Sequence, residues 1–302
     1  MAYRFKLDEP VGEEFRRIWL EHIARALAEA SRGSDQASAI HETRKCLKRI
    51  RSLLRLMRPV LGEPQFQEEN AKYRDIAHSL SGSRDRQMLF EVVTKLEAHA
   101  GQKQKTALQA FRTLLGATAP KMVEEAGSVL LTAVAGRLAA EAKQVEKMEI
   151  APPSIDGVLA GLERTYRQGR RANRKAYETT DEERFHELRK HVQQHWRQLL
   201  LLQEAWPEIL IARVGVTKQL AAILGDEHDL FILLTFLDSE EVQPLGNDQI
   251  RVMRRISLKR QKELRTEAQP HAERLYAEGA KTFARRVAAY WAAAQRISHR
   301  EE

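Results

Sequence analysis

The segment from His41 to Arg58, HETRKCLKRIRSLLRLMR, most constrains how this chain can fold. It contains neither glycine nor proline, and on a helix its apolar and basic side chains separate onto opposite faces. The apolar face comprises Thr43, Leu47, Ile50, Leu54 and Met57. The basic face comprises His41, Arg44, Lys45, Lys48, Arg51 and Arg55. The segment therefore predicts a long helix that buries one side and presents a row of cations on the other.

Cations at this spacing repel one another, and each pair costs about a few tenths of a kcal/mol. A bound polyanion would offset that cost, whereas an isolated basic helix is equally well explained as a solvated surface. The pattern is not isolated, because HETRK at 41–45 returns as HELRK at 186–190. LSGSRD at 80–85 is likewise matched by LGDEHD at 224–229, and Arg74 falls in register with Lys218.

The two copies predict an internal repeat, and APPS at 151–154 is the clearest break between them. We expect two related helical halves, residues 1–150 and 151–302. Equivalent helices would then come together, and their basic faces would oppose each other across a shared pore or groove.

Three further segments carry basic rows at helical spacing. The second motif has a weaker row, because Gln193 stands where the first copy has Lys48. Its members are His186, Arg189, Lys190 and Arg197. The segment 154–177 contributes Arg164, Arg167, Arg171, Arg174 and Lys175. Near the C-terminus the row comprises Arg251, Arg254, Arg255, Lys262 and Arg265. The positive surface is thus predicted to involve at least four helices.

Composition favours an all-α fold. Hydrophobic residues make up 43% of the chain, enough for a substantial core, while aromatic residues make up only 6%. No segment shows convincing strand alternation, and breaks are expected at Gly225-Asp226 and at Pro270. The expected helices run at about 13–30, 36–61, 64–80, 85–100, 102–115, 119–147, 154–177, 182–205, 208–224, 227–237, 247–268 and 270–297.

Charge and compartment narrow the choice of partner. The net charge of +8 favours an anionic partner, such as nucleic acid, polyphosphate or an anionic membrane surface. A single cysteine, Cys46, excludes an internal disulfide framework. The N-terminus lacks the apolar core of a signal peptide, and no apolar run reaches the roughly 18 residues that cross a membrane. We therefore expect a soluble cytoplasmic protein.

At this point the chain resembles a known family. A helix that opens with His-x-x-Arg-Lys and is followed by an Arg-Asp turn, both occurring twice, is similar to the conserved histidine α-helical domain, or CHAD, family. The resemblance covers about residues 10–297. It implies two helical bundles, related by pseudo-twofold symmetry around a basic central pore, and binding of inorganic polyphosphate without catalysis. Carried over, the pore residues would be His41, Arg44, Lys45, Lys48, His186, Arg189 and Lys190.

The chain also departs from the family pattern. His228 replaces the arginine of the second Arg-Asp motif, which weakens the case for symmetric use of that motif. The Glu-x-Glu-x-Lys motif of the triphosphate-tunnel domains that accompany some relatives is absent. The resemblance implies no cofactor, a monomer or homodimer, and a place in the cytoplasm, with polyphosphate granules as one destination.

Rows of arginine and lysine suit a polymer of phosphates. Arginine makes bidentate contacts to phosphate oxygens, lysine supplies mobile charge, and binding should weaken with salt. His195 falls on an apolar face and is predicted to be structural, while Asp85 and Asp229 are predicted to cap helices or orient arginines. The candidate polyphosphate-binding residues are His41, Arg44, Lys45, Lys48, Arg51, Arg55, Arg74, Arg164, Arg167, Arg171, Arg174, His186, Arg189, Lys190, Arg197, Lys218, Arg251 and Arg255.

Three other functions compete with polyphosphate binding as interpretations of the sequence. A metal-dependent phosphohydrolase is less favoured, because the histidines at 186 and 191 are five residues apart rather than four and His228-Asp229 lacks further ligands. RNA binding would use the same electrostatics, but the basic rows of this chain contain few of the aromatic residues on which single-strand-binding proteins commonly stack bases. A helical adaptor for an acidic protein is the third. We expect no catalysis and no metal.

Overall fold

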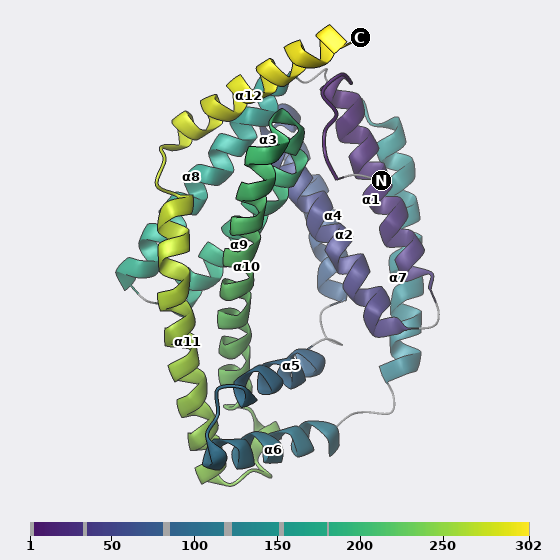
Figure 1. Ribbon diagram of the computed structural model, residues 1–302. Helices are drawn as coiled ribbons and strands as arrows, with labels where there is room; N and C mark the ends of the chain where they lie inside the picture. The colour runs from purple at the N-terminus through teal and green to yellow at the C-terminus, as the bar shows by residue number, and fades with distance from the viewer. Residues whose placement is uncertain are drawn as a thin grey trace.

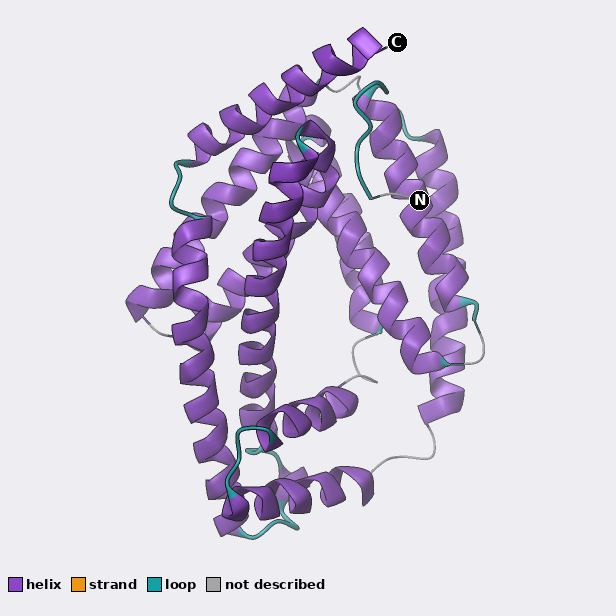
Figure 2. Ribbon diagram, in the orientation of Figure 1, coloured by secondary structure: helices purple, strands orange, loops and turns teal. Residues whose placement is uncertain are grey.

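The computed structural model describes residues 3–32, 35–80, 85–117, 123–150, 154–179 and 181–301, and throughout them the regular structure is helical, with no strand (Figures 1 and 2). The helices are α1 (Val11–Ala30), α2 (Gln36–Leu56), α3 (Arg58–Leu61), α4 (Glu63–Ser79), α5 (Asp85–Glu97), α6 (Gln102–Ala117), α7 (Val123–Lys147), α8 (Ile155–Thr179), α9 (Glu182–Leu201), α10 (Pro207–Phe236), α11 (Asn247–Leu275) and α12 (Ala280–Glu301), with 3₁₀ turns at Gln203–Ala205 and Glu240–Val242. The all-α prediction is confirmed.

The helices form two groups that diverge from one apex (Figure 1). In the first group α2 packs against α1 and α4, and α1 packs against α7. In the second group α9 packs between α8 and α10, and α10 packs against α11. The groups meet where α2 contacts both α8 and α9. At the opposite end, α5 and α6 leave the first group and pack on α10 and α11.

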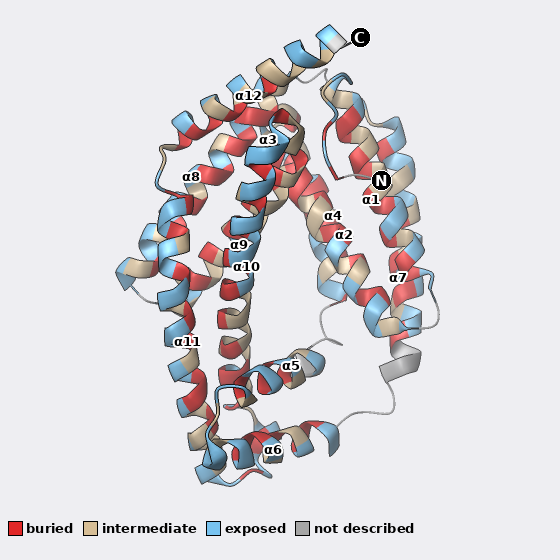
Figure 3. Cartoon of the chain, in the orientation of Figure 1, coloured by how far each residue is buried: buried red, intermediate tan, exposed pale blue. Residues whose placement is uncertain are grey.

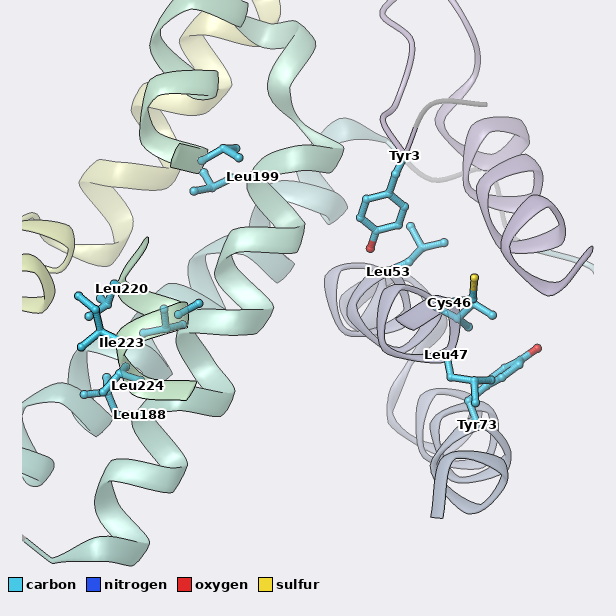
Figure 4. Close-up of a cluster of buried hydrophobic side chains, with 14 of the residues drawn as sticks. Tyr3, Cys46, Leu47, Leu53, Tyr73, Leu188, Leu199, Leu220, Ile223 and Leu224 are labelled. Carbon is cyan, nitrogen blue, oxygen red and sulfur yellow. The ribbon is translucent and has the colours of Figure 1, made fainter. Parts of the chain in front are cut away.

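The basic helix α2 forms as its pattern predicts. The Asp35 side chain caps it by accepting a hydrogen bond from the Ser38 backbone N–H (3.1 Å). Its predicted apolar face is buried throughout, and Figure 4 shows Cys46, Leu47 and Leu53 within this cluster of buried side chains. Full burial of each leucine contributes about 1.5–3 kcal/mol.

Three predicted helix limits are wrong: the end of α2, the break at Gly225-Asp226 and the break at Pro270. α2 ends at Leu56 instead of continuing to residue 61, because Pro59 has no N–H to donate and disrupts the turn before it; α3 then restarts around that proline. No break occurs at Gly225-Asp226, which lies inside the continuous helix α10. Asp229 is therefore within α10 and does not cap a helix.

The reason for continuity in α10 is packing. One glycine costs a helix only about 1 kcal/mol, and the buried Leu220, Leu224 and Leu230 on either side more than offset it. Similarly, Pro270 lies inside α11 and is exposed, while Ala268 and Ala272 beside it are fully buried. The break falls instead between Leu275 and Ala280.

The buried side chains form one cluster that extends through both groups (Figure 3). Within it, Trp19 donates through Nε1 to the Tyr73 hydroxyl (2.8 Å). The Tyr166 hydroxyl donates to the Leu275 carbonyl (2.8 Å). His195 is completely buried beside Tyr166, so its predicted structural position is confirmed. Burial lowers the pKa of His195 well below its ordinary value, so the ring is neutral.

Candidate polyanion-binding site

A polar cavity of about 300 Å³ lies where α2, α3, α8 and α9 meet. Its lining comprises Arg51, Arg55, Arg58, Arg164, Thr165, Gln168, Glu187, Lys190, His191 and Gln194. A second hollow of about 480 Å³ adjoins it, because both are lined by Arg164 and Gln168. The second is lined by Pro59, Ala160, Glu163, Arg164, Arg167, Gln168 and Arg171. We call the two together the basic groove.

Close contact between helices creates this groove. An added Cβ at Gly161 of α8 would lie 1.8 Å from the backbone oxygen of Leu56 at the end of α2, so only glycine permits the observed approach. One turn further along α8, Arg164 reaches the cavity beside the arginines of α2 and α3. Across the cavity, α9 is held to α2 by the Ser52 hydroxyl, which donates to the Gln194 carbonyl (3.3 Å).

Arg55 is the most unusual charge in the groove. Burial, followed by the positive charges of Arg51, Arg58 and Arg197, lowers its pKa to about 10. Its one hydrogen bond runs from Nη1 to the carbonyl of Arg51 (3.0 Å), and within the described residues no carboxylate lies within 4.0 Å. Removing a guanidinium from water without an anionic partner is costly, so Arg55 marks a place where negative charge would be stabilised.

The other groove cations are partly compensated. Arg51 donates through Nε to Oδ1 of Asn70 on α4 (3.1 Å), and Arg58 donates through Nε to Glu63 (2.7 Å). Arg167 and Lys190 form ion pairs with Glu163 and Glu187, respectively. Arg164 and Arg171 form no ion pair with any residue that the structure describes. The groove is therefore strongly positive at neutral pH.

The structure brings some predicted residues together and places others elsewhere. Those that line the groove are Arg51, Arg55, Arg164, Arg167, Arg171 and Lys190. Arg44 instead donates through Nη1 to the Ala77 carbonyl at the end of α4 (2.7 Å). His41 and Lys45 are exposed beside Glu42. Lys48 is half-buried on the same helix.

In the second group His186 contacts His228 of α10, with their Nδ1 atoms 3.2 Å apart. Burial and the charge of Arg189 lower the pKa of His228 to about 3. Arg197 lies over the Trp196 ring (5.2 Å), and burial lowers its pKa to about 10. The remaining predicted residues are exposed and lie away from the groove: Arg74, Arg174, Lys218, Arg251 and Arg255. Of these, Arg74, Arg174 and Arg251 form ion pairs with Asp75, Glu178 and Asp248. Arg84, from the first turn motif, lies outside the described residues.

Sequence reasoning missed several groove residues. They are Arg58, Thr165, Gln168, His191 and Gln194. Arg58 had a readable signal, since it continues the three- and four-residue spacing of Arg51 and Arg55. The neutral residues had none, because their position depends on how α8 and α9 approach α2.

Two negative findings bear on other functions. Across the residues described, no group of three or more histidine, cysteine, aspartate or glutamate side chains is arranged to hold a metal ion. In the described part of the chain, no helix is both long enough and apolar enough to cross a membrane.

Comparison with known proteins identifies the family. A search of curated proteins finds no match to this chain. A family model described as the CHAD domain matches residues 17–238 of the 302. The match includes α2, α3, α8 and α9, which are the helices that line the basic groove, and it ends before α11. By this match over more than half of its length, the chain belongs to the CHAD domain family.

Proposed function

We propose that the protein binds inorganic polyphosphate in the basic groove, without catalysing a reaction on it. The observation that carries this proposal is Arg55, a partly buried cation whose charged neighbours are Arg51, Arg58 and Arg197. A chain of phosphates would place oxygen acceptors among these guanidinium groups and replace their mutual repulsion with charge-assisted hydrogen bonds. Membership of the CHAD family, which is known to bind polyphosphate, supports the same conclusion.

The lining favours polyphosphate over RNA. None of the side chains that line the two hollows is phenylalanine, tyrosine or tryptophan. Proteins that bind single-stranded nucleic acid commonly stack bases on such rings, each worth about 1–3 kcal/mol. Phosphates alone, without bases, need only the cations and hydrogen-bond donors that this groove offers. Non-specific RNA binding through charge alone is the weaker alternative.

We also propose that the groove opens into a basic pore between two related halves, residues 1–150 and 151–302. The repeated motif on α2 and α9 supports this arrangement, as does the direct contact of those helices. The pore would continue from Arg55 past the partly buried Arg197, since these two charges influence each other. The predicted pore residues at the starts of α2 and α9 would lie further along it, and their role stays a prediction.

Calorimetric titration with long-chain polyphosphate, at near-physiological salt, tests the proposal directly. Single-stranded RNA of equal charge is the parallel ligand, and we expect the polyphosphate to bind far more tightly. The variant Arg55→Glu should lower the affinity about hundredfold, because it removes a charge-assisted contact and adds repulsion.

The matched control is Arg285→Glu, which makes the same charge change at an exposed position on α12 outside the groove. It should change the affinity less than about twofold, since exposed charges are screened by salt. Equal losses in the two variants, with both still folded by circular dichroism, would show that the binding surface is generic. Equal affinity of the wild type for RNA would move the function to RNA.

A further inference from the structure

His191 on α9 is the one histidine, among the described residues, that lines the basic groove. Its ring is partly buried, and neither ring nitrogen forms a hydrogen bond with a described residue; Nδ1 is also sealed from solvent. Buried polar atoms are normally paired, so an unpaired ring at the wall of a cationic cavity needs an explanation. The charged side chains that share the cavity with His191 are Arg51, Arg55, Arg58, Arg164, Glu187 and Lys190.

The surroundings of His191 keep its ring neutral while the cavity holds no anion. Burial lowers the pKa of His191, the charges of Lys190 and Arg55 lower it further, and Glu187 opposes them. Glu187 is committed to its ion pair with Lys190, and five cations face one carboxylate across the cavity. A polyanion in the cavity would reverse this balance, because its charges favour the protonated ring.

We propose that His191 takes up a proton from solvent when a phosphate chain enters the cavity, and that the imidazolium then donates a hydrogen bond to a phosphate oxygen. This inference rests on the proposed function and adds its regulation: binding is coupled to proton uptake and strengthens as the solution becomes mildly acidic. The other histidines of the motif are placed differently, since His186 contacts His228 and His41 is exposed.

The sign of the coupling follows from linkage. The free protein holds the His191 pKa below its ordinary value, and bound phosphate raises it. Affinity is therefore constant above the bound-state pKa, rises as the pH falls between the two values, and is constant again below the free-state pKa. Each unit by which binding raises the pKa adds about tenfold to the affinity at the acidic end.

Two measurements test the coupling on the full chain. Calorimetry at pH about 6.5, in two buffers of different protonation enthalpy, gives the protons taken up per bound chain; this pH is near the ordinary histidine pKa. We expect clear uptake by the wild type and a smaller value for His191→Gln. His271→Gln, on α11 and away from the groove, is the matched control and should equal the wild type.

The second measurement needs no variant and so does not depend on how His191→Gln folds. Histidine-selective NMR titration should show that the His191 pKa rises when polyphosphate binds. Tight binding with an unchanged His191 pKa, or with the same proton uptake in His191→Gln, would overturn this inference and leave the proposed function intact. Absence of polyphosphate binding by the wild type at every pH would overturn both.

Discussion

The helices α2 and α9 carry nearly the same five residues in their first turns, at 41–45 and 186–190, but these residues make different contacts. On α2, Arg44 and Arg51 are directed at α4, where they donate to the Ala77 carbonyl and to Asn70. On α9, His186 contacts His228 of α10. One turn later, Lys190 and His191 line the groove. On α2 the groove therefore begins about two turns beyond the motif, at Arg51, whereas on α9 it includes Glu187 and Lys190 of the motif itself.

The helices on the two sides of the groove supply different kinds of side chain. α2 and α3 supply permanently charged arginines, whereas α9 supplies a lysine, a titratable histidine and the neutral Gln194. The charge that α9 lacks comes from Arg164, Arg167 and Arg171 of α8. The side of the groove formed by α2 and α3 is therefore cationic, and the side formed by α9 offers mainly hydrogen-bonding groups. The helix α8 supplies further positive charge.

Gly161→Ala should have the largest effect, because it disturbs the contact that brings α8 to α2. The added Cβ would lie 1.8 Å from a backbone oxygen, which cannot move aside as a flexible side chain would. We expect a loss of about 1–3 kcal/mol in the free energy of unfolding, measured by urea denaturation, together with weaker polyphosphate binding.

The matched control is Gly215→Ala on α10, where an added Cβ meets nothing within 4 Å. It should stabilise the helix by about 0.5–1 kcal/mol. If both variants were equally stable, the close α2–α8 approach would not be what positions the cations of α8.

Acid should weaken the contact between α9 and α10, where His186 meets His228. His228 is neutral in the folded protein, with a pKa of about 3, but takes up a proton near its ordinary pKa when unfolded. Stability is therefore lost as the pH falls from about 6.5 toward the folded-state value. His228→Asn should remove on the order of 2 kcal/mol of that acid sensitivity, allowing for solvent screening.

The measurement is the urea midpoint at several pH values, with exposed His41→Asn as the control. A similar loss of acid sensitivity in both variants would mean that the burial of His228 is not the source of that sensitivity.

The smallest effect tests whether α8 supplies charge to the groove. Arg164→Gln combined with Arg171→Gln removes two cations that form no ion pair in the described residues. Polyphosphate affinity should fall about tenfold, and the slope of log affinity against log salt should become shallower by about 1.4. Lys218→Gln with Arg255→Gln, both exposed and outside the groove, should leave the slope unchanged. An unaltered slope in the first variant would mean that polyphosphate does not contact Arg164 and Arg171 of α8.

Much of the fold could be read from periodicity, because each long helix carries its own apolar face. The apolar side of α2 and the start of α9 at Glu182 needed no knowledge of the rest of the chain. The limits that failed were at Gly225 and Pro270, where buried leucine and alanine neighbours outweigh a weak local helix propensity.

The groove was less predictable for a related reason. The basic rows of α2 and α8 were visible in the sequence, but nothing within either row shows that Gly161 would meet Leu56. That single contact decides which cations converge. Arg251 and Arg255, which look equivalent in sequence, lie on an exposed face of α11 outside the groove.

The passage of α5 and α6 from the first group to the second has a consequence for how the chain folds. Lys95 of α5 pairs with Asp226 (2.6 Å), the Phe5 N–H donates to the Leu201 carbonyl (2.9 Å), and Gln295 donates to the Leu7 carbonyl (3.1 Å). Partners so distant in sequence meet late, since closing long loops is slow. During synthesis, the apolar surfaces of α5 and α6 stay exposed until α10 and α11 have emerged from the ribosome. We therefore expect this family member to depend on chaperones while it is being made, and its first 150 residues to aggregate when expressed alone.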